Sequence, residues 1–140
     1  MKAANFMLDT DTFSYLVSGR HPSVRIAVTR NQNRVRLSSV TLAEALFGAK
    51  KKGSQKLLSL IALFREIFPV EGWDASAAEV YSDIRSRMER DGHPIGNMDL
   101  MIAASAISSG CSLVTNNERH FCAVPGLSVV NWTKADAEGA

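Results

Sequence analysis

The stretch FMLDTDT, residues Phe6 to Thr12, combines a short apolar run with an acid and a helix start. Phe6–Leu8 is the length and composition of a buried strand. Asp9 ends this run, and residues 10–12 can cap a helix that continues to Gly19. A strand that leads directly into a helix is typical of α/β proteins, which bind ligands at the carboxyl ends of their strands.

The same alternation of short strand-like runs and longer helical patterns continues along the chain. We expect further strands at 35–38, 67–70, 111–115 and 127–130, with helices between them. Pro22 suits the first turn of a helix, and Thr41 and Glu44 have the spacing of a capping box. The sequence therefore predicts one α/β domain over residues 1–133, with a short, mainly parallel sheet between layers of helices, and a flexible tail over 134–140.

The composition is that of a globular protein: of 140 residues, 46% are hydrophobic and 21% charged. No apolar run is long enough to cross a bilayer, and the first ten residues look like a strand rather than a signal peptide. We therefore expect a cytoplasmic protein with no membrane partner. Cys111 and Cys122 lack the spacing of a metal site, which favours buried structural thiols over a disulfide.

The charge is unevenly distributed, although the net charge is only +2. Residues 1–70 carry a balance of +7 and residues 71–140 a balance of −5. Two interpretations stay open, because a basic half can attract a polyanion, whereas Lys and Arg are also common on solvated helices. The basic residues concerned are Arg20, Arg25, Arg30, Arg34, Arg36, Lys50, Lys51, Lys52 and Lys56.

Two more acids stand in apolar surroundings at predicted junctions: Glu44 in TLAEALFGA and Asp99 in NMDLMIAA. With Asp9, and with Asn116 and Asn117, we expect them just beyond the carboxyl ends of strands, where a parallel sheet brings them together. Each acid alone could merely cap or complement a helix. Together they predict an oxygen-lined site for a divalent cation that activates water for phosphodiester hydrolysis.

Four blocks in this order, FMLDTDTFSYL, SSVTLAEALFGAKK, GHPIGNMDLMIAASAISSG and LVTNNERHFCAVPGLSVVNW, resemble the PIN-domain ribonucleases and, among them, the VapC toxins of bacterial toxin–antitoxin pairs. The resemblance implies a Rossmann-like, three-layer PIN fold. It also implies Mg²⁺ as cofactor, with Mn²⁺ as a substitute, and cleavage of a structured RNA such as tRNA. A homodimer and a cognate VapB-type antitoxin follow from the same resemblance.

Carried over by motif, the resemblance implies Asp9, Glu44 and Asp99 as metal ligands and catalytic residues, with Asn117 in the same pocket. His120 stands where the family often has a further acid, which puts a second metal ion in doubt. This histidine could instead bind a phosphate or a water, or simply lie on the surface. Further residues expected to orient the acids or contact the substrate are Thr10, Asp11, Thr115 and Asn116.

Two other functions remain possible from the sequence. The pair Asp9 and Asp11 resembles the start of Asp-nucleophile phosphatases, although Phe13 and the lack of a late acid pair argue against that class. His120 motivates a scaffold that binds RNA or antitoxin without cleavage.

The apolar stretch 57–64 could form a groove for an antitoxin helix or a dimer contact, although we favour a core helix.

Overall fold

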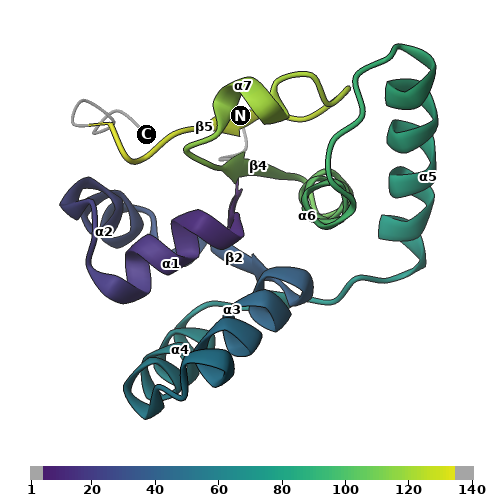
Figure 1. Ribbon diagram of the computed structural model, residues 1–140. Helices are drawn as coiled ribbons and strands as arrows, with labels where there is room; N and C mark the ends of the chain where they lie inside the picture. The colour runs from purple at the N-terminus through teal and green to yellow at the C-terminus, as the bar shows by residue number, and fades with distance from the viewer. Residues whose placement is uncertain (1–4, 135–140) are drawn as a thin grey trace.

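A parallel sheet of five strands forms the centre of the computed structural model, which describes residues 5–134 (Figure 1). The strand order is β3-β2-β1-β4-β5, so the chain adds β2 and β3 on one side of the central β1 and then crosses to add β4 and β5 on the other side. Such a reversal opens a crevice at the carboxyl edge of the sheet. The strands are β1 Asn5–Leu8, β2 Val35–Ser38, β3 Val70–Glu71, β4 Cys111–Val114 and β5 Val129–Val130.

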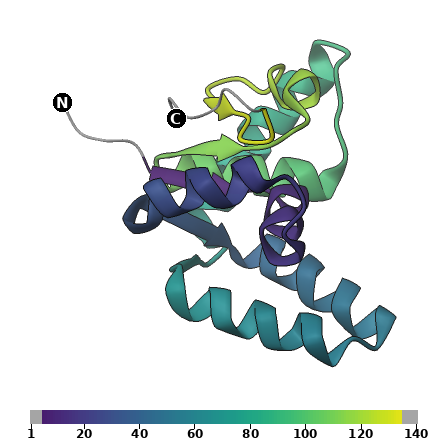
Figure 2. The same cartoon turned by 90° about the vertical axis from the view of Figure 1, so that its left-hand side faces the viewer.

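Helices cover both faces of this sheet, which gives the three layers that the sequence predicts (Figures 1 and 2). One face packs against α1 (Thr10–Ser18), α2 (Pro22–Arg30), α3 (Ser39–Lys52) and α4 (Gln55–Ile67). On the other face, α6 (Asn97–Ser108) and α7 (Glu118–Phe121) pack on the sheet, and α5 (Ala75–Arg90) packs on the outer side of α6 (Figure 1). A short 3-10 turn, Gln32–Arg34, precedes β2. Figure 2 shows α3 and α4 side by side as a hairpin at one end of the molecule.

The position of β1 between two hydrophobic cores explains why its sequence is continuously apolar. Phe6 and Leu8 point into the core under α1 to α4, whereas Met7 points into the core under α5 and α6. Successive side chains of a strand face opposite sides, so a parallel strand with helices on both faces must be apolar at every position. The run Phe6–Leu8 therefore encodes both cores at once.

The outer strands are shorter than the sequence suggests. We expected a strand at 67–70, but α4 continues to Ile67 and the strand covers only Val70–Glu71. The strand expected at 127–130 is reduced to Val129–Val130. Pro69 has no N–H to donate, although its carbonyl accepts a bond from Leu37 N–H at 3.0 Å. The predicted tail beyond residue 134 lies outside the described residues.

The start of α3 also differs from the sequence prediction. Ser38 is the N-cap, and its hydroxyl accepts the Val40 N–H at 3.1 Å. The prediction of a capping box between Thr41 and Glu44 is therefore wrong, because both residues lie inside the helix. Thr41 is fully buried, and its hydroxyl is within 3.5 Å of the Leu8 carbonyl. Glu44 is thus free to serve another purpose than capping.

The helix α4 is less buried than a core helix. Ile61 is buried, but Leu63 is 55% and Ile67 41% exposed. Both of these side chains line a groove of about 370 Å³ between α2 and α4, together with Val28 and Phe68. Of the two interpretations of residues 57–64, the structure supports a helix that packs on one side and leaves an apolar groove on the other.

The two cysteines are separate in space and form no disulfide. Cys111 is buried in β4, as expected, and burial raises the pKa of its thiol to about 11. Cys122 is exposed, so the expectation of burial is wrong for this thiol. In the described part of the chain, no helix combines the length and the apolar character needed to span a membrane.

Trp132 provides a test of how the end of the chain stabilises the fold. It is fully buried, its ring packs on Phe6 with centroids 5.0 Å apart, and its carbonyl accepts the Ser23 hydroxyl at 2.8 Å. Trp132→Ala should lower the free energy of unfolding by about 3–5 kcal/mol, because it opens a cavity beside the central strand. Urea denaturation should show this loss, with the exposed Ile26→Ala as a control that costs less than about 1 kcal/mol.

Candidate active site

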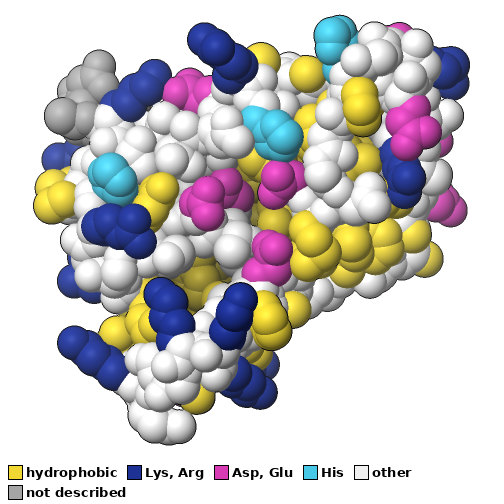
Figure 3. All heavy atoms as spheres, viewed as in Figure 1, with side chains coloured by type: hydrophobic (Ala, Val, Ile, Leu, Met, Phe, Trp, Pro, Cys, Tyr) yellow, Lys and Arg dark blue, Asp and Glu magenta, His cyan; other side chains and the backbone are white. Residues whose placement is uncertain are grey.

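A small polar pocket opens at the carboxyl edge of the sheet, in the crevice beside β1. Its volume is about 140 Å³, and acidic side chains dominate its lining. Figure 3 shows Asp and Glu side chains gathered near the middle of this face, with a His side chain next to them. The lining residues are Asp9, Thr10, Asp11, Glu44, Asp99, Asn117 and Phe121.

The three predicted acids reach this pocket by different routes. Asp9 follows β1 directly, and its N–H donates to the Val114 carbonyl at 3.0 Å. Glu44 lies in the second turn of α3, and Asp99 lies in the first turn of α6. The expectation that all three follow strands is therefore wrong for Asp99, since α6 precedes β4. A helix that leads into a parallel strand begins at the carboxyl edge, which brings Asp99 to the same place.

Asp9 is the most constrained of these acids. Only 5% of it is exposed, and one carboxylate oxygen accepts the Thr12 N–H at 2.8 Å as the N-cap of α1. Burial raises the pKa of Asp9 above its usual value, while hydrogen bonds from Thr115 and Thr12 lower it in part. The raised pKa means that ionised Asp9 lacks a sufficient partner in the protein itself.

Glu44 and Asp99 each have a hydrogen-bond partner from another segment. The Thr10 hydroxyl donates to Glu44 Oε1. His120 Nε2 lies 3.0 Å from Asp99 Oδ2, the distance of a hydrogen bond to a carboxylate. His120 is thus part of the site rather than a surface histidine. Within residues 5–134, no three His, Cys, Asp or Glu side chains are arranged in this structure so that they could hold a metal ion together.

The polar residues after β4 separate into two groups. Asn117 lines the pocket, as expected, and its N–H donates to the Thr115 hydroxyl at 3.0 Å. Thr115 is fully buried and hydrogen-bonds to Asp9, so it supports the central acid. Asn116 instead donates to the Tyr15 hydroxyl at 3.1 Å and does not line the pocket. Sequence reasoning missed Phe121, whose apolar ring carries no chemical signal beyond its place beside His120.

The donors of this pocket suit a hard divalent cation. They are carboxylate and amide oxygens, which Mg²⁺ prefers, and the volume equals that of about four or five waters. Buried Asp9 would gain the positive partner that it lacks. Glu44 and Asp99 would turn from Thr10 and His120 to share such an ion. The residues present therefore fit a divalent cation, and Asp11 lies at the rim as an exposed acid.

Comparison with known proteins agrees with this geometry. The model of the PIN domain family matches residues 6–127. The chain is 39% identical to the "tRNA(fMet)-specific endonuclease VapC" of Shigella flexneri over 129 residues, which is 91% of this chain and 98% of that protein. This chain is a PIN-domain protein of the VapC family. The VapC relative "Ribonuclease VapC2" of Rickettsia felis is 32% identical and covers 92% of this chain and 98% of its own length.

Solved structures of VapC proteins share the fold over nearly the whole chain. The DNA-bound VapBC of Salmonella typhimurium has a TM-score of 0.87 at 34% identity, covering 93% of this chain and 99% of that one. VapBC2 of Rickettsia felis, bound to a promoter DNA fragment, has a TM-score of 0.85 at 30% identity, covering 91% and 98%. The expected family and three-layer fold are confirmed, and the resemblance to Asp-nucleophile phosphatases loses its basis.

Asp9→Asn separates the charge of this residue from its role as a helix cap. Because the folded pKa of Asp9 is raised, the folded protein binds the proton of this residue more tightly than the unfolded chain does, and the wild-type protein loses stability as the pH rises from 3.8 through the folded pKa. The asparagine of the variant carries no charge at any pH and can still cap α1. In EDTA, Asp9→Asn should therefore melt at a higher temperature than wild type near neutral pH, with the difference shrinking toward pH 3.8, the ordinary pKa of an Asp.

Thermal melts across this pH range measure the effect, and Asp9→Ala is the matched control. That variant removes the cap as well as the charge, and loss of the cap costs about 0.5–2 kcal/mol. If Asp9→Asn melted below wild type at neutral pH, burial of the charge would not be the dominant influence on this residue.

Proposed function

We propose that this VapC-family protein is a metal-dependent endoribonuclease and the toxin of a toxin–antitoxin pair. The observation that carries the proposal is the pocket in which Asp9, directly after β1, meets acids from α3 and α6 at the switch point of the sheet. Two relatives named as tRNA(fMet)-specific endonucleases, 39% and 35% identical, point to the same chemistry.

Asp9, Glu44 and Asp99 would hold one Mg²⁺ ion, and Mn²⁺ could replace it because it also accepts oxygen ligands. When bound, the cation supplies Lewis acidity and offsets the negative charge that builds on a phosphate during hydrolysis. A fourth carboxylate is missing at position 120, where this chain has His. We therefore expect a single ion rather than a pair.

The remaining residues of the pocket position groups. Thr10 orients Glu44 through its hydroxyl, and His120 orients Asp99 through Nε2. Asn117 presents a neutral amide to the same space and can donate to a phosphate oxygen without adding negative charge. Phe121 supplies an apolar part of the pocket lining. Thr10 and His120 thus orient the acids and Asn117 can bind the phosphate, whereas the acids supply the negative charge that would hold the cation.

The substrate follows from the relatives rather than from the pocket. Phosphate contacts position a nucleic acid without identifying it, and a pocket of about 140 Å³ would hold little more than the phosphate at the cleaved bond. Because the relatives from Shigella flexneri and Salmonella typhimurium are named tRNA(fMet)-specific, initiator tRNA is the first substrate to test.

A VapB-type antitoxin is the proposed partner, because the similar structures from Salmonella typhimurium and Rickettsia felis were solved as VapBC complexes. The apolar groove between α2 and α4 suits one face of an amphipathic helix, with Leu63 and Ile67 as exposed contacts. A basic antitoxin residue that enters the acid pocket would relieve the repulsion between the carboxylates and compete with the metal. A homodimer stays a prediction, which sedimentation at several concentrations would test.

Cleavage of tRNA tests the enzyme. Purified protein, freed of antitoxin, should cut an initiator tRNA transcript in Mg²⁺ or Mn²⁺ and lose the activity in EDTA. Asp99→Asn and Glu44→Gln should lower the cleavage rate by about 10²-fold or more, since each removes one charge from the ligand set. The exposed Asp83→Asn on α5 is a matched control that keeps full activity.

Metal binding should be measured separately from activity. Mn²⁺ should raise the melting temperature of wild type and of Asp83→Asn, but much less that of Asp99→Asn. If Mn²⁺ binds and none of several RNA pools is cut, the protein is a binding scaffold and not a nuclease.

Leu63→Glu tests the groove. A charge at this exposed apolar position should weaken the complex with the VapB-type antitoxin by about tenfold or more, because it must be desolvated against an apolar helix. Cleavage of tRNA should be unchanged. Ile26→Glu is the control, since Ile26 is similarly exposed on α2 but does not line the groove. Equal loss of binding in both variants, measured by titration calorimetry, would place the antitoxin elsewhere.

A further inference from the structure

A second hollow adjoins the acid pocket and has a different character. It is a trough of about 240 Å³ between α1 and the α3–α4 hairpin. It shares Thr10, Asp11 and Glu44 with the acid pocket, so the two spaces are continuous. Its other lining residues are mainly apolar along the floor and basic at the rim: Phe13, Val17, Ala45, Ala49, Leu57, Ile61, Arg20 and Lys52, with Ser14, Ser18 and Gly48 between them.

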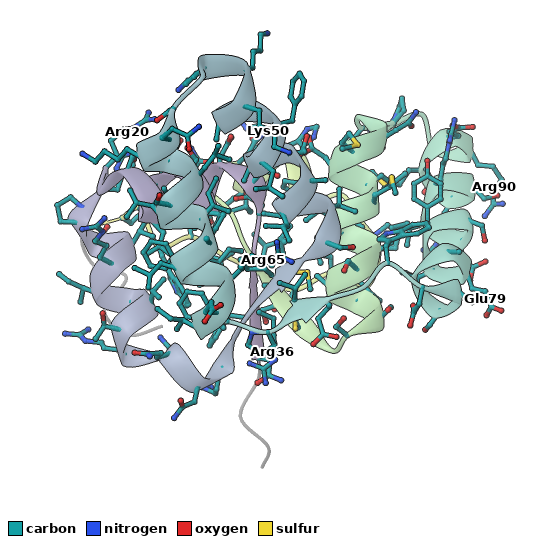
Figure 4. The ribbon with its side chains drawn as sticks, turned by 90° about the horizontal axis from the view of Figure 1, so that it is seen from below. Arg20, Arg36, Lys50, Arg65, Glu79 and Arg90 are labelled. Carbon is teal, nitrogen blue, oxygen red and sulfur yellow. The ribbon has the colours of Figure 1, made fainter. Side chains whose placement is uncertain are left out.

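The basic rim comes from two separate turns of the chain. Arg20 follows the end of α1, and Lys52 is the last residue of α3. Figure 4 shows Arg20 and Lys50, which precedes Lys52 on α3, at the same end of the molecule, and Figure 3 shows Lys and Arg side chains gathered over the α3–α4 end. Within residues 5–134, no acid forms an ion pair with Arg20 or Lys52. The two charges are therefore available to an anion from outside.

Arg20 is held in place rather than loose. Gly19, with a φ of 79°, ends α1 in the left-handed conformation and turns the chain toward the trough. The Arg20 guanidinium then lies over the Tyr15 ring, 5.1 Å from its centroid. Tyr15 in turn accepts a hydrogen bond from Asn116, beside the acid pocket. This chain of contacts fixes the position of a cation relative to the site of cleavage.

We propose that this trough binds the RNA strand next to the cleaved bond, with Arg20 and Lys52 holding its neighbouring phosphates. The inference rests on the proposed ribonuclease function. RNA fits the order of features along the surface, because a cleaved phosphodiester at the acids must be followed by a sugar, a base and another phosphate. The apolar floor accepts the sugar and base, and the basic rim accepts the phosphate. An apolar peptide would leave both cations unused.

The cations of the trough also offset the repulsion between the acid pocket and a negatively charged RNA. Three carboxylates repel RNA, so attraction must come from cations placed just outside them. Lys50 and Lys51 lie on the same helix end as Lys52 and add to this field. Of the two interpretations of the basic half of the chain, the structure favours a binding role for this subset and leaves Arg36, at the far end in Figure 4, outside it.

The test measures binding of fluorescein-labelled initiator tRNA by anisotropy at several salt concentrations, in the cleavage-deficient Asp99→Asn protein. Arg20→Ala with Lys52→Ala should raise Kd about tenfold or more near 0.1 M salt. The slope of log Kd against log salt should fall by about 1.4, as expected for loss of two contacts to a single strand. Arg20→Lys with Lys52→Arg should restore both values.

Arg87→Ala with Arg90→Ala is the matched control, because it removes the same charge from the end of α5, on the opposite side of the molecule (Figure 4). In proteins with Asp99 intact, the trough variant should raise KM and leave kcat within about threefold. Melting temperatures verify that each variant is folded. An equal loss of tRNA binding in the α5 variant, or an unchanged salt slope in the trough variant, overturns the proposal.

Two further outcomes distinguish an RNA-binding trough from an antitoxin site and from a failure of the proposed nuclease function. If the trough variant binds tRNA normally but loses the VapB-type antitoxin, the trough is a protein site and the proposal fails. If wild type cuts no RNA yet the trough variant alone loses tRNA binding and salt slope, the proposed nuclease function fails while the RNA-binding trough stands.

Discussion

The carboxyl group of Asp9, buried between the central strand and the start of α1, is the constraint on which the rest of the site depends. Its backbone continues the pairing of β1 with β4, and its side chain caps α1. Moving it would disturb the sheet and the helix together. Because a buried charge is unfavourable, the fold gathers hydrogen bonds from Thr12 and Thr115 around it and still leaves its pKa raised. A bound cation, as proposed, would stabilise the ionised form of Asp9.

Glu44 and Asp99 are less constrained than Asp9. Glu44 and Asp99 sit on helices and are only partly buried, each engaged with a neutral or basic neighbour. Rotation about their side-chain bonds can exchange those neighbours for a cation without moving the backbone. Asp9 has no such freedom, since its cap bond fixes it. In the proposed metal site, one rigid acid would therefore stand beside two adaptable ones, which would suit ions that differ in size, such as Mg²⁺ and Mn²⁺.

Sequence patterns predicted what depends on local chemistry. The strand Phe6–Leu8, the cap at Asp9 and the helix beginning at Pro22 follow from rules that act within a few residues. The three acids were identified because carboxylates in apolar surroundings need a partner. Patterns failed where distant contacts decide: Asp99 precedes its strand, Thr41 lies inside α3 with its hydroxyl near the Leu8 carbonyl, and Asn116 turns to Tyr15. The meeting of His120 with Asp99, and the trough beside them, arise only when segments far apart in the chain are packed together.

The brevity of the outer strands limits how this protein can associate. Both edges of the sheet, β3 and β5, have two residues each, so little unpaired backbone is offered to another chain. Long, flat edge strands recruit further strands and lead to aggregation. The exposed apolar side chains that could contact another protein, such as Leu63 and Ile67, lie instead on a helix. An antitoxin that binds helix side chains can dissociate without breaking backbone hydrogen bonds of the sheet, so the binding can be reversible.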